Sequence, residues 1–126
     1  MKSHIAQAVE VLRDGGVVTC PTEGVFGLSC LPADAAAVQR LLDIKQREAS
    51  KGLILIAANR EQLRDWIAVN PDEIPEPTAD EAITWLVPAA EQVSELVRGE
   101  HPKLAVRITT NPIARELCAT VGSPLV

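Results

Sequence analysis

The spacing of hydrophobic residues changes along the chain between a helical and a strand-like period, which predicts a mixed fold. Apolar side chains recur at intervals of three and four residues over 3–14, 35–47 and 111–121, the pattern of a helix with one buried face. Short apolar runs predict strands at five places: 17–20, 26–30, 53–57, 84–87 and 104–108. We therefore expect a sheet with flanking helices, of the α/β (α+β) class.

Capping residues mark the ends of the three longest helices. Ser3, Asp34 and Asn111 are the expected N-caps, because their side-chain oxygens can accept hydrogen bonds from the first free N–H groups of a helix. Gly15 and Gly122 are expected at the C-terminal ends, where a left-handed backbone favours glycine. These signals predict both the number of long helices and their approximate lengths.

Prolines are expected to interrupt regular structure. Pro21 and Pro88 should stop the strands before them, since proline has no backbone N–H to give to a sheet. Residues 71–77 hold three prolines among three acidic residues, which predicts an exposed acidic loop. Shorter helices are predicted on either side of this loop, over 59–67 and 89–97.

Two of the predicted strands have different patterns. Residues 53–57 are continuously apolar, which is typical of a strand covered on both faces. Residues 104–108 alternate, so one face should carry Leu104, Val106 and Ile108. Arg107 and Thr109 then belong to the opposite face, away from the core.

The length of 126 residues predicts one domain over residues 1–126. The formal net charge of the 126 residues is -5, so the whole molecule has no field that would attract nucleic acid from a distance. The three cysteines are widely spaced among apolar residues, as buried thiols in a reducing compartment are. No apolar stretch is long enough to span a membrane, and no signal peptide is recognisable, which predicts a cytoplasmic protein without membrane contact.

Several common kinds of site are not supported by any motif. The sequence contains no Gly-Lys-Ser/Thr phosphate loop, no Gly-x-Gly-x-x-Gly and no Cys-x-x-Cys, and His4 and His101 are far apart. No metal site built from protein side chains is therefore predicted.

Lys45, Arg47 and Lys51 place three positive charges within seven residues, between the end of a helix and the start of a strand. An arginine fork beside lysines suits a polyphosphate, which would offset the repulsion among these cations. The alternative is that Lys45 and Arg47 only complement the negative end of the helix, an effect of under about 1 kcal/mol, and that Lys51 is solvated. These residues alone leave both interpretations open.

The turn at 21–24 and the strand after it form a second candidate segment. Thr22 exposes a hydroxyl at a strand end, where open α/β sheets usually bind ligands, although it could instead bond its own backbone. Phe26 could line a substrate or pack in the core, and Glu23 could be a general base or a solvated cap. Arg107 could bind an anion or form a surface ion pair.

Six short motifs follow one another along the chain: Pro-Thr-Glu-x-Val-Phe-Gly-Leu at 21–28, Leu-Leu-x-x-Lys-x-Arg at 41–47, Lys-Gly-Leu-Ile at 51–54, Thr-Trp-Leu-Val-Pro at 84–88, Ala-Val-Arg at 105–107 and Ser-Pro-Leu-Val at 123–126. The ordered set resembles the YrdC family of threonylcarbamoyl-adenylate synthases, from about residue 10 to the last residue, although each motif is weak alone. The last motif is expected to begin a further strand.

This resemblance implies a twisted mixed sheet with a concave basic face. Members of the family combine L-threonine, bicarbonate and ATP into L-threonylcarbamoyladenylate (threonylcarbamoyl-AMP) and release pyrophosphate. Partner proteins then pass the threonylcarbamoyl group to an adenosine of tRNA. A nucleotidyltransferase of this kind implies ATP as a substrate and Mg²⁺ as its accompanying ion.

The resemblance also implies roles for individual residues. Carbamate attack on the α-phosphate needs charge neutralisation and positioning more than a dedicated base, so a cation cluster without an obvious base is expected. Lys45 and Arg47 would be catalytic, on the nucleotide phosphates. The substrate-binding residues would be Thr22, Phe26, Lys51 and Arg107.

Two departures from the family pattern bear on activity. Ala79-Asp80-Glu81-Ala82 stands where the family has Trp-Pro-Gly-Pro, and its two negative charges should weaken nucleotide binding. The sequence stops just before the family's Ser-Thr-Ser-Ala-Asn, whose hydroxyls and amide line the ATP site. We expect a C-terminally short domain that is either impaired or covered over its apolar surface by a homodimer contact.

Two functions without catalysis compete with the synthase. The first is an RNA-binding or ribosome-associated module that uses the same cations, against which count the acidic net charge and the scarcity of aromatic residues. The second is a scaffold that binds threonine or a nucleotide as a regulatory ligand. Pyrophosphate release that needs threonine and bicarbonate together would separate the synthase from both.

Overall fold

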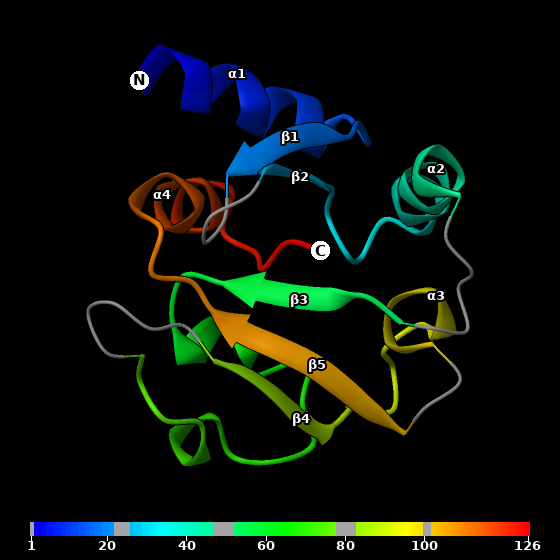
Figure 1. Cartoon of the computed structure of the whole chain (residues 1–126), viewed down its shortest axis with the longest axis vertical. Helices are drawn as coiled ribbons and strands as arrows, with labels where there is room; N and C mark the ends of the chain where they lie inside the picture. The colour runs from blue at the N-terminus through cyan, green and yellow to red at the C-terminus, as the bar shows by residue number, and fades with distance from the viewer. Residues whose placement is uncertain (1, 22–25, 47–51, 78–82, 100–101) are drawn as a thin grey trace.

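The computed structural model describes residues 2–21, 26–46, 52–77, 83–99 and 102–126. Its helices and strands follow in this order: α1 (Lys2–Arg13), β1 (Val18–Pro21), β2 (Phe26–Ser29), α2 (Ala35–Lys45), β3 (Ile54–Ala57), the 3₁₀ helices η2 (Arg60–Leu63) and η3 (Pro71–Glu73), β4 (Thr84–Pro88), α3 (Glu95–Arg98), β5 (Lys103–Ile108) and α4 (Pro112–Val121). Figure 1 shows a β-hairpin and a separate sheet with helices packed around them. The expected mixed α/β class is confirmed.

The strands form two sheets that the C-terminal residues connect. β1 and β2 are an antiparallel hairpin, and the other sheet has the order β3-β5-β4, with β5 parallel to β3 and antiparallel to β4. Leu125 pairs with Ile56 through two backbone hydrogen bonds of 2.6 and 2.8 Å, and the Val126 N–H donates to the carbonyl of Cys30 at 3.2 Å. The C-terminus therefore lies between the hairpin and the three-stranded sheet (Figure 1). The strand expected over 123–126 is reduced to this one bridge.

Two buried clusters hold these layers together. The larger lies on one face of the three-stranded sheet, where Leu55 and Val106 are fully buried against α2 residues that include Leu41. The smaller joins α1 and α4, through side chains that include Leu12 and Leu117. The aliphatic side chains of both clusters follow the helical and strand periods of the sequence.

The expected helix caps explain where the longer helices begin. The Asp34 carboxylate accepts from the Ala37 N–H at 3.1 Å, and the Asn111 side-chain oxygen accepts from the N–H groups of Ile113 and Ala114 at 2.9 and 3.2 Å. Both predictions are confirmed. Ser3 differs, because α1 already begins at Lys2 and includes it.

Two proline predictions are wrong by one residue each. Pro21 is the last residue of β1, opposite Phe26, and Pro88 is the last residue of β4, opposite Lys103. A proline can occupy the end of an edge strand because its missing N–H is not needed there. The Pro88 carbonyl in fact accepts a hydrogen bond from the Ala68 N–H at 2.8 Å.

Two burial predictions are also corrected. Only one face of β3 is fully covered: Leu55 and Ala57 are fully buried, whereas on the other face Ile54 is 39% exposed and Ile56 is partly buried against the smaller cluster. Thr109 was expected on the exposed face of its strand but is fully buried. The reason is that β5 ends at Ile108 and the chain turns into α4, so that the Thr109 hydroxyl accepts from the Asn111 N–H at 3.1 Å.

The predicted short helices are shorter than expected. Segment 59–67 forms only η2, segment 89–97 contributes only the start of α3, and the proline-rich loop contains η3 and the buried Ile74. Propensity is a weak guide for such short elements, because tertiary contacts outweigh it.

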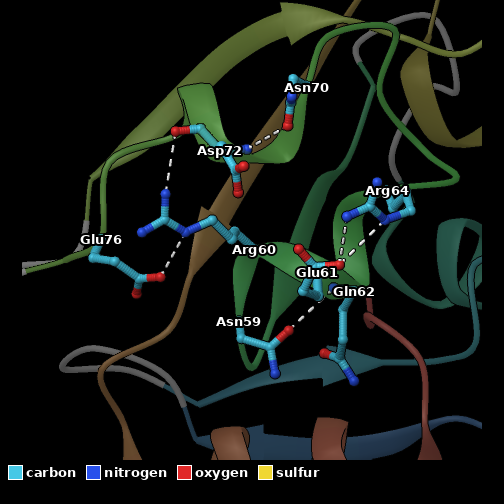
Figure 2. A network of polar contacts seen from close by, with 8 residues as sticks. All are labelled: Asn59, Arg60, Glu61, Gln62, Arg64, Asn70, Asp72 and Glu76. Carbon is cyan, nitrogen blue, oxygen red and sulfur yellow. Dashed lines mark hydrogen bonds and ion pairs between the residues drawn. The ribbon is translucent and has the colours of Figure 1, made fainter.

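Polar contacts tie η2 to the loop that follows it (Figure 2). Arg60 donates from Nε to Glu76 Oε1 at 2.8 Å and from Nη1 to the Asp72 carbonyl at 3.1 Å. Asn59 caps η2 by accepting from the Gln62 N–H at 3.1 Å. This network holds the acidic loop in place and neutralises part of its charge, while Asn70 caps η3 within the loop by accepting from the Asp72 N–H at 2.9 Å.

Gly52 and Gly122 offer a matched test of how closely α3 packs. Both have φ of +74°, but a Cβ at Gly52 would lie 2.7 Å from the Arg98 carbonyl oxygen, whereas a Cβ at Gly122 would meet nothing within 4 Å. Gly122→Ala should cost only the left-handed strain of about 1–2 kcal/mol. Gly52→Ala should cost a further 1–3 kcal/mol or so from the clash. Urea unfolding measures both; equal costs would contradict the tight contact.

Candidate functional site

The three-stranded sheet has a face that the larger cluster does not cover, although Ile56, next to Arg107 on this face, packs against the smaller cluster. Register places Thr84 beside Arg107, and Leu86 and Ile54 on either side of Ala105. We call these five residues the open face. Arg107 therefore points away from the core, as predicted, and is half-buried while Val106 beside it is fully buried.

Arg107 is held by its neighbour on β4. Its Nε donates to the Thr84 hydroxyl oxygen at 2.9 Å. A guanidinium carries five N–H donors in a rigid plane, so a bond at Nε restricts the orientation of the whole group. The open face thus presents an oriented cation.

An apolar row lies beside this cation. Ile54 is 39% and Leu86 68% exposed, and Ala105 lies between them. This row is two residues along β5 from Arg107, or about 6.6–6.8 Å at the usual rise of a strand. A cation beside an apolar floor suits a ligand with one flat apolar part and one anionic part.

The other predicted site residues are only partly described. Lys45 is exposed in the last turn of α2, and Phe26 begins β2 opposite Pro21. Thr22, Arg47 and Lys51 lie outside the described residues, as do Glu23 and the segment 79–82. Convergence of the cations in one hollow therefore stays a prediction.

A cavity of about 340 Å³ lies elsewhere, between the start of α2, residues 65–66 and segment 92–97. Its volume is within the range of small-ligand pockets. Among its described lining residues, however, Asp65 is the one charged side chain, and none of the predicted site residues lines it. An anionic substrate would be repelled there, so we take the open face as the candidate site.

Nucleophilic and metal-centred chemistry have little support in the described part of the chain. Burial, and secondly the negative charge of Asp34, raise the pKa of the Cys30 thiol from 9.0 to about 11, which keeps it protonated at neutral pH. Cys118 is also buried, with its thiol 3.6 Å from the Ile56 carbonyl. The described residues contain no group of three His, Cys, Asp or Glu that could hold a metal ion, and none of their helices is long and apolar enough to cross a membrane.

The family model Sua5/YciO/YrdC, which carries the description telomere recombination, matches residues 10–126 of the chain. The chain belongs to this family. The resemblance seen in the ordered motifs is thereby confirmed, and the mixed sheet with flanking helices is the YrdC-type fold.

Curated relatives of this YrdC-type chain are named threonylcarbamoyl-AMP synthases, which makes it a member of an enzyme family. The protein of Chromohalobacter salexigens is 47% identical, and the match covers 98% of this chain and 68% of the relative. The protein of Nitrosococcus oceani is 44% identical with the same coverage of 98% and 68%.

A solved structure has the same fold over nearly the whole chain. The crystal structure of P. abyssi Sua5 complexed with L-threonine superposes with a TM-score of 0.87 at 30% identity. The match covers 99% of this chain and 38% of the Sua5 chain, so the YrdC-type chain spans well under half of that protein.

Sequence reasoning did not identify Thr84, Ile54 or Leu86 as part of the site. Thr84 stood in a recognised motif, Thr-Trp-Leu-Val-Pro at 84–88. Its role became visible only from the register of β4 against β5, which puts it opposite a residue 23 positions away. The sequence alone gave no signal for Leu86, because its exposure on the edge strand β4 is visible only in the structure.

Proposed function

We propose that this chain catalyses the threonylcarbamoyl-AMP synthase reaction. L-threonine and bicarbonate form a carbamate with loss of water, and a carbamate oxygen attacks the α-phosphate of ATP, with pyrophosphate as the leaving group. The observation that carries the proposal is the 47% identity to a threonylcarbamoyl-AMP synthase over 98% of the chain. Nucleotidyl transfer is the class of reaction that this product requires.

The open face supports this assignment chemically. ATP, bicarbonate and the carboxylate of threonine are negatively charged, and charge develops on phosphoryl oxygens during transfer, so oriented cations stabilise the transition state. Arg107 supplies one such cation, and none of the five open-face residues is acidic. The apolar row offers a surface on which the flat base of ATP can lie.

The remaining roles follow from the family motifs. Lys45 and Arg47 act on the phosphates as catalytic residues, Lys51 binds the same phosphates, and Thr22 and Phe26 contact the substrate. Lys45 is exposed at the end of α2 and thus accessible to solvent-borne ligands. None of the five open-face residues is a general base, which is in keeping with a reaction that depends on positioning.

Mg²⁺ fits this site only as a companion of the nucleotide. Within the described ranges no cluster of His, Cys, Asp or Glu could hold it, and Mg²⁺ commonly binds through substrate phosphates and water. We therefore place the ion with ATP as part of the substrate. No step of the proposed mechanism relies on a protein-bound metal.

The product implies further partners. Threonylcarbamoyl-AMP is a mixed anhydride and a reactive acyl donor, so partner proteins that transfer its acyl group to a tRNA adenosine are part of the proposal. Direct RNA contact and a homodimer stay predictions.

Pyrophosphate release tests the proposal directly. Release should require L-threonine, bicarbonate and ATP together and should stop when any one is omitted, because the carbamate forms only from the first two. Mass spectrometry of the adenylate confirms the product. If the chain binds RNA in a salt-dependent manner but releases no pyrophosphate, it is the RNA-binding module and not the synthase.

A further inference from the structure

We infer that Thr84 is a positioning residue that orients the Arg107 guanidinium for anion binding on the open face. As far as substrate turnover is concerned, this inference rests on the proposed function. That Thr84 orients Arg107 rests on the hydrogen bond between them and does not depend on the proposed function.

The sheet register brings the two side chains together. Thr84 on β4 is directly opposite Arg107 on β5 in an antiparallel pair, so both side chains leave the sheet on the same face with Cβ atoms about 4.5–5.5 Å apart. Both residues are half-buried. A half-buried side chain can restrain its neighbour and still be reached by a ligand.

The chemistry of the contact suits orientation and not neutralisation. Arg107 Nε donates to the Thr84 hydroxyl oxygen at 2.9 Å, a normal length for such a bond. The hydroxyl has no formal charge, so this bond restricts the plane of the guanidinium and does not itself neutralise it. A carboxylate in the same place would also cancel the field that attracts an anion.

Threonine is well suited to this task. Its branched Cβ restricts χ1 to few rotamers, so the hydroxyl oxygen has a defined position relative to the strand. A pre-oriented guanidinium then loses less conformational entropy when an anion binds. Thr84 and Arg107 both lie on strands, which hold functional groups more precisely than loops do.

The kinetic test uses three single variants. Thr84→Val keeps the shape but removes the acceptor, and we expect kcat/KM for pyrophosphate release to fall about tenfold or more, the loss typical of one hydrogen bond to a charged group. Thr84→Ser should stay within about threefold of the wild type. Thr120→Val, a threonine on the exposed side of α4, serves as the matched control and should change nothing.

A double-mutant cycle separates positioning from a merely structural role. Lysine has a methylene group where arginine has Nε–H, so Arg107→Lys removes the donor of the bond to Thr84. In that background Thr84→Val should have almost no further effect. Equal losses in both backgrounds would overturn the inference, because they would show that Thr84 acts independently of Arg107.

An NMR measurement keeps the test independent of catalysis. The Arg107 Nε–H signal, assigned by its disappearance in Arg107→Lys, should exchange slowly with water in the wild type and in Thr84→Ser, and quickly in Thr84→Val. Unchanged exchange in Thr84→Val would refute the orienting bond. If the wild type releases no pyrophosphate, the proposed function fails while this measurement still decides on Thr84.

Discussion

Replacing Arg107 by alanine is expected to lower kcat/KM for pyrophosphate release by about 100-fold or more, the effect of losing one preorganised charge donor in a catalytic site. The loss should exceed that of Thr84→Val, since Thr84 acts only through Arg107. Arg107→Lys should fall between the two, because the charge remains but the planar fork is lost.

The control for this experiment is Arg64→Ala. Arg64 is an exposed arginine that pairs with Glu61 at 2.7 Å next to η2, away from the open face, and surface pairs of this kind contribute little to stability. Its removal should leave pyrophosphate release unchanged. Because Arg107 is half-buried and belongs to neither buried cluster, Arg107→Ala should remain folded by circular dichroism. Wild-type turnover in a folded Arg107→Ala protein would remove the open face as the active site.

The second large effect concerns stability and the unequal burial of the two faces of β3. Leu55→Ala should reduce the free energy of unfolding by about 2–5 kcal/mol, since it opens a cavity in the larger cluster, where Leu55 is fully buried. The corresponding fall in Tm is on the order of 10 °C for a domain of this size. Thermal and urea unfolding measure it.

Ile54 is the matched control on the same strand. It is 39% exposed and lies on the open face, so Ile54→Ala should cost about 1 kcal/mol, in proportion to the smaller area it removes from burial. If the two variants were equally destabilised, β3 would be covered on both faces, as the continuous apolar run first suggested. Comparing Leu55→Ala with Ile54→Ala thus tests whether the two faces of β3 are buried unequally, as in the structure, or equally, as the apolar run predicts.

The long helices and the central strand were predictable because local signals and burial agree there. α2 and α4 each combine an N-cap with an apolar stripe, and in β5 buried residues alternate with exposed or half-buried ones. When capping, period and packing point to the same structure, sequence reasoning is dependable. Where they did not agree, as in segment 59–67, a 3₁₀ turn replaced the expected helix.

The candidate site was predictable in only one of its parts. The alternation of 104–108 sufficed to place Arg107 off the core, which the structure confirms. The pairing partner of a strand is not encoded in its own sequence, so Thr84 could not be connected to Arg107 before the register was known. Lys45 is located at the end of α2 as expected, and its approach to the other cations stays a prediction.

The sequence by itself determined the class of fold, the long helices with their caps, and membership in the Sua5/YciO/YrdC family, because these depend on local periods and on short ordered motifs. The tertiary structure alone decided which face of the sheet stays open, which threonine holds Arg107, and how Leu125 joins β3. These features arise from pairing between segments far apart in the chain, and such pairing depends on how all the elements pack together.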